Sequence, residues 1–357
     1  MTIPIIRPES VTPDWLSAVL AHGGCMARVR DFTAARVGTG QIGDSVRFTL
    51  DYADRDERAP ATLVGKFPSP HEDSRQAGIT LGNYIREVHF YNQLADSARI
   101  CVPKTYFAAV DEASSEFVLM MEDLAPAEQG DQMKGVTLDQ ARTVLGEAAK
   151  LHASHWDDAA IDEMPWVNFT TAAPGNATPS DTVQQLWQGF RERYGSRVDA
   201  ECTEIGNAFS ARHESYQFGY RGPRCLTHND YRPDNMMFAS ARGGYPVAVV
   251  DWQSLGLGCG AVDVSYFLGG ALLRDVRRAE EEKLLAFYLG ELETQGVTGY
   301  SFEQLRHDYA RHSFQLFLTA FFAAMLVQQT ERGDVMFFTM LRRAADQIID
   351  WNALSLL

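Results

Sequence analysis

The sequence has few cysteines and no long apolar run, and these shortages exclude several classes of protein. Its 357 residues include five cysteines that are widely spaced and form no C-x-x-C pair, so we expect neither a disulfide framework nor a zinc knuckle. The longest apolar stretch, over 316–327, is too short for a membrane span, which takes about 20 residues. The N-terminus also lacks the basic start and apolar run of a signal peptide. We therefore expect a cytoplasmic protein without a membrane partner.

A run of basic residues is also missing. The formal net charge is -15, whereas proteins that bind nucleic acid usually present a basic face, so we expect no nucleic-acid partner. Only five residues are lysines, so a lysine inside an apolar strand is conspicuous. The sequence carries no signal for an oligomeric state.

Apolar spacing predicts two regions of different type. The first contains a helix over 11–24, strands over 30–37, 45–52 and 61–67, a loop around Pro68, Pro70 and Gly78, a helix over 81–95, and strands over 104–110 and 116–121. The second begins with a capping box at Thr137 and Gln140, and it is mainly helical, with short strands at 226–227, 236–238 and 245–250. This order predicts an α+β fold.

The chemistry is concentrated in the segment His228-Asn229-Asp230-Tyr231-Arg232-Pro233-Asp234-Asn235. Phosphoryl transfer from ATP to an alcohol needs a carboxylate for the hydroxyl proton, and an amide and a second carboxylate that hold Mg²⁺ on the phosphates. Asp230 fits the first role. Asn235 and Asp251, which ends an apolar strand, fit the other two. Such residues often make ordinary turns, but the spacing together with Asp251-Trp252-Gln253 favours phosphoryl transfer.

A glycine cluster forms a second motif, G-x-G-x-x-G, at Gly38, Gly40 and Gly43. In a dinucleotide-binding oxidoreductase such glycines open a helix, whereas here a predicted strand over 45–52 follows them. A hairpin of this kind is typical of a loop that covers phosphates, because backbone N–H groups approach closely where no Cβ intervenes. An ordinary glycine hairpin is the alternative.

Lys66 lies in the apolar strand 63–67 and forms the third motif. A half-buried ammonium group needs a partner, and kinase chemistry supplies ATP phosphates and a helix glutamate. Glu87, on the next predicted helix, is the best candidate for that glutamate. The alternatives are an edge-strand lysine and a surface ion pair of Glu87 with a neighbouring arginine.

Together these motifs resemble the aminoglycoside phosphotransferase and choline kinase superfamily, and most of all its ecdysteroid-kinase-like branch and bacterial relatives, over roughly residues 30–320. The resemblance implies a bilobal protein-kinase-like fold. A small N-terminal antiparallel β-sheet lobe with one main helix, residues 1–124, is expected to bind the nucleotide. A larger, mainly helical C-terminal lobe, residues 125–357, is expected to carry catalysis and acceptor binding.

The resemblance also implies roles for single residues. His228 is expected to brace the catalytic loop, and Asp263 to have a buried structural role. Arg232 is expected to stabilise charge in catalysis, with a surface arginine as the alternative. Adenine is expected to be held by backbone groups near Glu122 and Leu124.

The sequence therefore predicts an ATP- and Mg²⁺-dependent phosphotransferase that acts on a hydroxyl group of a small molecule by direct in-line transfer. A catalytically silent nucleotide-binding module is the alternative, although it would usually have lost Lys66, Asp230 or Asp251. A protein kinase is disfavoured, because Asn229 replaces the arginine of H-R-D and no A-P-E follows. Aminoglycosides, choline-like alcohols, sugars and hydroxylated steroids or terpenoids stay open as acceptors, as does GTP in place of ATP.

Overall fold

The computed structural model describes residues 2–38, 42–167, 178–326 and 329–357. The chain forms two compact units. Unit 1 consists of Met1–Ser97, Cys101–Glu128 and Ala239–Ser254, and unit 2 consists of Ala98–Ile100, Gln129–Phe238 and Leu255–Leu357. Unit 1 therefore includes a segment around residue 250 in addition to the N-terminal region. The roles expected for residues 1–124 and 125–357 stay predictions.

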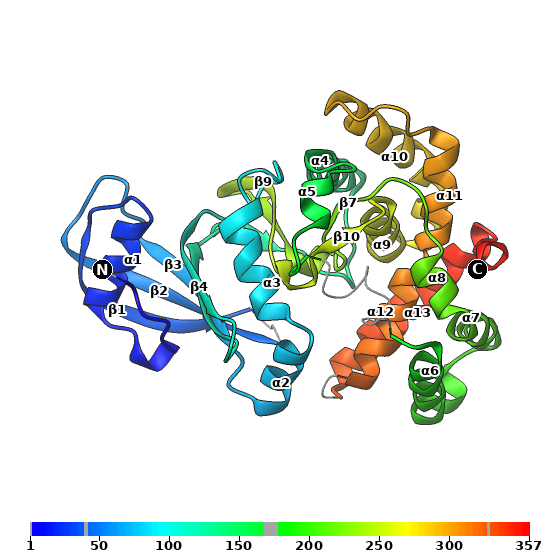
Figure 1. Ribbon diagram of the computed structural model, residues 1–357, viewed down its shortest axis with the longest axis horizontal. Helices are drawn as coiled ribbons and strands as arrows, with labels where there is room; N and C mark the ends of the chain where they lie inside the picture. The colour runs from blue at the N-terminus through cyan, green and yellow to red at the C-terminus, as the bar shows by residue number, and fades with distance from the viewer. Residues whose placement is uncertain (1, 39–41, 168–177, 327–328) are drawn as a thin grey trace. The chain divides into compact units, whose positions relative to one another are not determined.

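Unit 1 is built on a five-stranded antiparallel sheet in the order β1-β2-β3-β5-β4 (Figure 1). Its strands are β1 (Arg28–Val37), β2 (Gly43–Asp54), β3 (Thr62–Pro68), β4 (Thr105–Asp111) and β5 (Glu116–Glu122). Successive side chains of a strand point to opposite faces. In β3, Leu63 and Phe67 are therefore buried on one face and Lys66 is presented on the other.

The first helix, α1 (Pro13–His22), packs on this sheet (Figure 1). Its N-terminus is capped as the sequence predicts, because the Thr12 hydroxyl accepts a hydrogen bond from the Trp15 amide at 3.2 Å. Leu16, Val19 and Leu20 are fully buried and share a hydrophobic core with Phe48 and other apolar residues of the strands. The core of unit 1 thus lies between α1 and the sheet.

Two helices connect β3 to β4, and one of them was predicted wrongly. The stretch around Pro70 and Gly78, which the sequence analysis assigned to a loop, contains helix α2 (Glu72–Thr80). Pro68 and Pro70 both precede the helix, so neither interrupts its hydrogen bonds. Gly78 packs against Tyr84, where a Cβ would lie 2.6 Å from the ring. The glycine therefore permits a close contact with the next helix, α3 (Asn83–His89), which continues as a π-helical turn, Phe90–Leu94.

The segment 239–254 is fastened to α3 and its π-helical turn. It contains β9 (Gly243–Val249) and the short helical turn Trp252–Ser254. The Trp252 ring stacks on Phe90 with ring centroids 3.9 Å apart and planes inclined by 12°. Arg86 donates a hydrogen bond from Nη1 to the Gln253 carbonyl at 2.6 Å. These contacts set the position of Asp251, which lies between the strand and the turn.

Unit 2 is mainly helical (Figure 1). Its helices are α4 (Leu138–Ser154), α5 (Ala159–Asp162), α6 (Ser180–Tyr194), α7 (Ala200–Ala211), α8 (His213–Phe218), α9 (Ala261–Ala271), α10 (Arg274–Thr294), α11 (Phe302–His312), α12 (Phe314–Leu326) and α13 (Glu331–Asp350). Strands β7 (Cys225–Thr227) and β10 (Gly256–Gly258) form an antiparallel pair. Strands β6 (Glu128–Gln129) and β8 (Met236–Ser240) carry the chain from one unit into the other.

An aromatic core holds α6, α7, α12 and α13 together. It includes Trp187, Phe190 and Phe321, all of them at most 2% exposed, and a stacked pair of Phe209 and Phe314 with centroids 5.0 Å apart. The predicted capping box at the start of α4 is confirmed, with reciprocal hydrogen bonds of 3.2 and 3.0 Å between Thr137 and Gln140. Across the described ranges, every helix is too short or too polar to cross a membrane.

Candidate active site

The polar loop of residues 228–235 connects β7 to β8, and α9 holds its backbone. The amides of His228 and Asn229 donate to the two oxygens of the Asp263 carboxylate at 2.7 and 2.8 Å. Asp263 is fully buried, and His152 lies 3.2 Å from its Oδ2. Hydrogen bonds of this kind, from backbone amides to an ionised carboxylate, are stronger than those between neutral groups. Asp263 thus has the buried structural position that the resemblance implies.

The side chains of the polar loop converge on Asp230. Asn235 donates from Nδ2 to Asp230 Oδ2 at 2.8 Å and to the Asp230 carbonyl at 2.9 Å. Arg232 Nε lies 3.1 and 3.2 Å from the two carboxylate oxygens. His228 is fully buried, and its Nδ1 accepts the Asp230 amide at 3.3 Å. The structure therefore brings these four predicted residues together, and the Asp230 side chain stays 19% exposed.

Tyr266 also contacts Asp230, and the sequence analysis missed it. Its hydroxyl donates to Asp230 Oδ1 at 2.9 Å from the middle of α9. Burial raises the pKa of the Tyr266 phenol well above its ordinary value, and the charge of Asp230 adds to the increase. The sequence held one signal for this contact, because Tyr266 follows Asp263 by three residues and so lies on the same face of a helix.

A second polar cluster lies within unit 1 and consists of Lys66, Glu87 and Asp251. Lys66 Nζ lies 2.7 Å from Glu87 Oε2 and 2.7 Å from Asp251 Oδ1. The predicted ion pair of Lys66 with Glu87 is confirmed, whereas the contact with Asp251 was not foreseen. The Lys66 side chain is only 12% exposed and that of Glu87 only 1%. Burial opposes the ammonium charge, but the two carboxylates outweigh it and raise the pKa of Lys66 above its ordinary value.

The backbone at Asp251 is itself unusual. Its φ angle is 69°, in the left-handed region that residues with a Cβ seldom adopt. Such a conformation persists where surrounding contacts enforce it, here the ion pair with Lys66 and the stacking of the next residue, Trp252. The Asp251 carboxylate is thus held in place by both its side chain and its backbone.

The glycine motif begins at the end of β1 and ends at the start of β2. Gly38 has a φ angle of +77°, which favours glycine. A Cβ on Gly43 would lie 3.0 Å from Lys66 Cε, so the missing side chain leaves room beside the lysine. The loop is tied to α3, because the Tyr84 hydroxyl donates to the Ile42 carbonyl at 2.6 Å. Gly40 lies outside the described residues.

Glu122 and Leu124, the residues expected near adenine, lie at and just after the end of β5. The Glu122 carboxylate accepts hydrogen bonds from the Lys104 amide and the Tyr245 hydroxyl, both at 3.1 Å. The Leu124 carbonyl accepts the Ala127 amide at 2.9 Å in a turn. Their role in nucleotide binding stays a prediction.

Each of the two clusters, taken by itself, contains an oxygen atom of a kind that Mg²⁺ binds. This ion prefers carboxylate and carbonyl oxygens, and it takes few protein ligands and completes its shell with phosphates and water. Asn235 uses its amide nitrogen for Asp230, so its amide oxygen is the atom left to bind a cation. Asp251 contributes a carboxylate. In the described part of the chain, no group of three or more His, Cys, Asp or Glu side chains could hold a metal ion.

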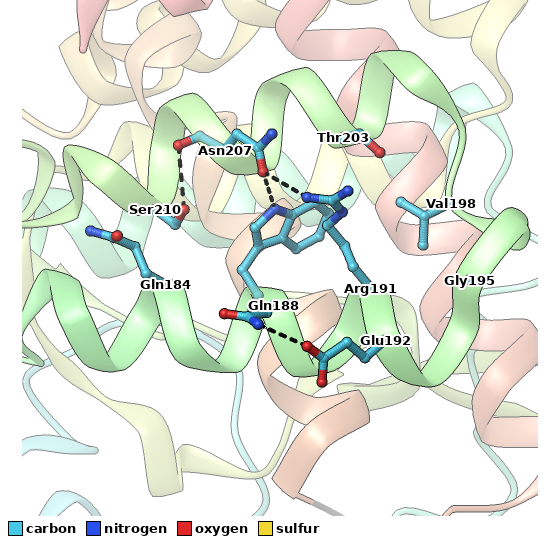
Figure 2. A pocket seen from close by; sticks show the side chains of 10 residues that line it. Gln184, Gln188, Arg191, Glu192, Gly195, Val198, Thr203, Asn207 and Ser210 are labelled. Atoms are coloured by element: carbon cyan, nitrogen blue, oxygen red, sulfur yellow. Dashed lines mark hydrogen bonds between the residues drawn. The ribbon is translucent and has the colours of Figure 1, made fainter.

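A cavity of about 690 Å³ lies elsewhere in unit 2, between α6 and α7 (Figure 2). Its walls are mostly polar, and Trp187 and Arg191 both donate to Asn207 Oδ1, at 2.9 and 3.4 Å. None of its lining residues belongs to the polar loop or to α9. The cavity is therefore not lined by any of the predicted site residues.

Comparison with known proteins identifies the family and the fold. Residues 42–297 match the model of the ecdysteroid kinase-like family. Among solved structures, choline kinase LicA from Streptococcus pneumoniae is 14% identical, with 96% of this chain and 99% of that chain covered and a TM-score of 0.54. Choline kinase from Cryptosporidium parvum is 10% identical, with coverage of 96% and 95% and a TM-score of 0.55.

A third structure, ethanolamine kinase from Plasmodium vivax, is 10% identical, with coverage of 94% and 85% and a TM-score of 0.54. At such identities the likeness shows the fold, and the predicted bilobal kinase-like fold is confirmed. A search of curated proteins found no match. Because the family model covers most of the chain, this protein belongs to the ecdysteroid kinase-like family.

Proposed function

We propose that this protein transfers the γ-phosphoryl group of ATP, with the help of Mg²⁺, to a hydroxyl group of a small molecule. The observation that supports this most strongly is the contact of Lys66 with both Glu87 and Asp251. These three residues come from separate parts of the sequence, and each was singled out by the requirements of phosphoryl transfer. A mere surface lysine would be exposed and would not be held between two carboxylates.

Asp230 is the residue proposed to receive the acceptor proton. As the acceptor oxygen forms its bond to the γ-phosphorus, the O–H proton passes to the Asp230 carboxylate. The bond between that phosphorus and the oxygen bridging it to the β-phosphate breaks, and ADP leaves. Arg232 is proposed to stabilise the negative charge of the transferred group. His228 is proposed to brace the loop at Asp230, whose backbone amide it contacts.

The residues of unit 1 are proposed to bind the nucleotide. Lys66, fixed by Glu87, and the glycines at 38, 40 and 43 would position the phosphates, and backbone groups near Glu122 and Leu124 would hold adenine. Mg²⁺, when bound through Asn235 and Asp251, supplies positive charge that neutralises the phosphate oxygens. In the present structure the Asp251 carboxylate forms an ion pair with Lys66.

The acceptor is proposed to be a small hydroxylated compound. The solved relatives are named as kinases of choline, ethanolamine and aminopropanol, and as aminoglycoside phosphotransferases. For this chain we propose only the shared chemistry, a primary or secondary alcohol as acceptor.

The test is ATP consumption by the purified protein with Mg²⁺ against aminoglycosides, amino alcohols, sugars, sterols and terpenoid alcohols, with GTP as a second donor. We expect Asp230→Asn to lower turnover about 10²- to 10⁴-fold with nucleotide affinity nearly unchanged, because it removes the proton acceptor alone. Asp251→Asn should weaken Mg²⁺–ATP binding itself, measured by calorimetry. Asp139→Asn, which changes a side chain that is 97% exposed, is the matched control.

Each outcome decides a separate point. Turnover at the wild-type rate in Asp230→Asn would remove Asp230 from the mechanism. Nucleotide binding without turnover on any acceptor would favour a catalytically silent module. A protein that binds neither ATP nor GTP would contradict the proposed function altogether.

A further inference from the structure

The carboxylate of Asp230 is tied to a second element as well as to its own loop. Arg232 and Asn235, two of its side-chain donors, lie within five residues of it in sequence. The third donor, Tyr266, lies 36 residues further along the chain and contacts Oδ1 at 2.9 Å. Donors that belong to the polar loop move with it, so they cannot fix the carboxylate relative to the rest of unit 2. Tyr266 links the carboxylate directly to another element, helix α9.

Helix α9 is a rigid support for this contact. All eleven of its residues are buried, and Tyr266 is only 1% exposed. One turn earlier, Asp263 accepts the backbone amides of His228 and Asn229. Residues three apart share a face of a helix, so one face of α9 binds both the backbone of the loop and the side chain of Asp230.

Arg232 is less suited to hold Asp230 throughout a reaction. Its side chain is 21% exposed, and its Nε is shared between the two oxygens of Asp230 at 3.1 and 3.2 Å. If it turns towards a phosphoryl group, as its proposed role requires, Asp230 loses this contact. The Tyr266 phenol is buried and neutral at neutral pH, as any tyrosine is, and burial raises its pKa further. It therefore donates to Asp230 whatever Arg232 does.

We propose that Tyr266 is a positioning residue for phosphoryl transfer, which fixes the orientation of the Asp230 carboxylate through its hydroxyl group on helix α9. The inference rests on the proposed function, because it assigns to Asp230 the reception of the acceptor proton. Tyr266 itself touches neither the nucleotide nor the acceptor in this proposal. Its effect is on the rate of the transfer step and not on the binding of either substrate.

The test compares Tyr266→Phe with Tyr309→Phe. Tyr309 is also fully buried, and its hydroxyl also donates to a carboxylate, Glu281, at 3.1 Å. Both variants lose one buried phenol–carboxylate hydrogen bond, but only one loses it at Asp230. We expect Tyr266→Phe to lower kcat about ten- to a hundredfold, the effect of one hydrogen bond to a charged group, with both KM values within about twofold. Tyr309→Phe should keep the wild-type kcat and show a similar loss of thermal stability.

A second measurement does not depend on activity. In an Asp230→Ala background the Tyr266 phenol has lost its acceptor, so adding Tyr266→Phe should cost less than about half of the Tm decrease that it causes in the wild type. Tyr309→Phe should cost the same in both backgrounds. Because Tm is measured without turnover, this cycle supports or overturns the contact even where a variant is too unstable for kinetics.

Two results would overturn the inference. If the wild type is active and the Tyr266→Phe and Tyr309→Phe variants have equal kcat values, Tyr266 has no positioning role. Additive Tm changes in the cycle would lead to the same conclusion. Both results would leave the proposed function intact. A wild type without turnover on any acceptor would remove the proposed function, and the role of Tyr266 with it.

Discussion

At the scale of single residues, Lys66 supplies the positive charge of the cluster that it forms with Glu87 and Asp251 in unit 1. Its ammonium group lies 2.7 Å from a carboxylate oxygen of Glu87 and 2.7 Å from one of Asp251. Burying a charged group is costly unless an opposite charge accompanies it. Removing Lys66 would therefore leave Glu87, which is almost fully buried, as a carboxylate without a neutralising partner.

We predict that Lys66→Met lowers the free energy of unfolding by about 3–5 kcal/mol at pH 8, the cost of breaking a buried pair from one side. The variant should recover stability as the pH falls towards 5, because burial raises the pKa of Glu87 and the lysine no longer opposes that increase. A group whose pKa is higher in the folded state binds more protons there, so low pH favours folding. Urea unfolding at pH 5 and pH 8 measures both effects.

The matched control is Lys283→Met, which removes a lysine that is 70% exposed and pairs with Glu280 on the surface. Its effect should stay below about 1 kcal/mol at either pH. In the wild type, the raised pKa of Lys66 means that its contribution is present at neutral pH and is lost only above the ordinary lysine range. Equal losses in both variants would contradict the buried cluster.

At the scale of elements, the contact between α3 with its π-helical turn and the segment after β9 holds the cluster together. Glu87 belongs to the helix and Asp251 to the segment, while Trp252 stacks on Phe90 between them. Trp252 is fully buried, and its indole N–H donates to the Val249 carbonyl at 3.2 Å. The ring thus joins the end of a strand to a helix, and both carry a carboxylate that contacts Lys66.

We predict that Trp252→Ala lowers the free energy of unfolding by about 3–5 kcal/mol, because it leaves a large cavity beside Phe90. Trp252→Phe keeps an aromatic ring for stacking and should cost about 1–3 kcal/mol less than the alanine variant. Denaturant unfolding of both variants gives the comparison. If the two variants were equally stable, stacking on Phe90 would not be the main contribution of this side chain.

At the scale of the whole molecule, local sequence patterns predicted most of the strands and helices but not the contacts between them. The caps of α1 and α4, the strands of the sheet and the helical second half follow from periodicity and capping residues, which are local. Helix α2 was missed because Gly78 was taken for a loop residue, whereas it permits the close approach of Tyr84.

For the candidate site, the sequence likewise predicted most of the residues but not all of the contacts between them. The polar loop and the pair of Lys66 with Glu87 could be named, because the chemistry of phosphoryl transfer asks for those residue types at those spacings. The contacts of Lys66 with Asp251 and of Tyr266 with Asp230 were not predicted, since they join positions 185 and 36 residues apart and depend on how helices and strands pack. Residue type alone does not specify such contacts.

Because unit 1 draws on residues 239–254, we predict that a fragment of residues 1–128 is incompletely folded. It lacks the ring that covers Phe90 and one of the two carboxylates at Lys66. The amides of α3 should exchange with solvent at least about tenfold faster than in the full chain, as measured by hydrogen exchange. Equal protection in the fragment would show that the first 128 residues form a stable unit by themselves.

The three-part composition of unit 1 also has a consequence for biosynthesis. Residues 1–128 leave the ribosome first, yet the segment with Asp251 and Trp252 follows only after another hundred or so residues of unit 2 have been made. At usual rates of translation this delay is on the order of ten seconds. During that time Phe90 lacks the ring that covers it, and Lys66 has only Glu87 of its two carboxylate partners.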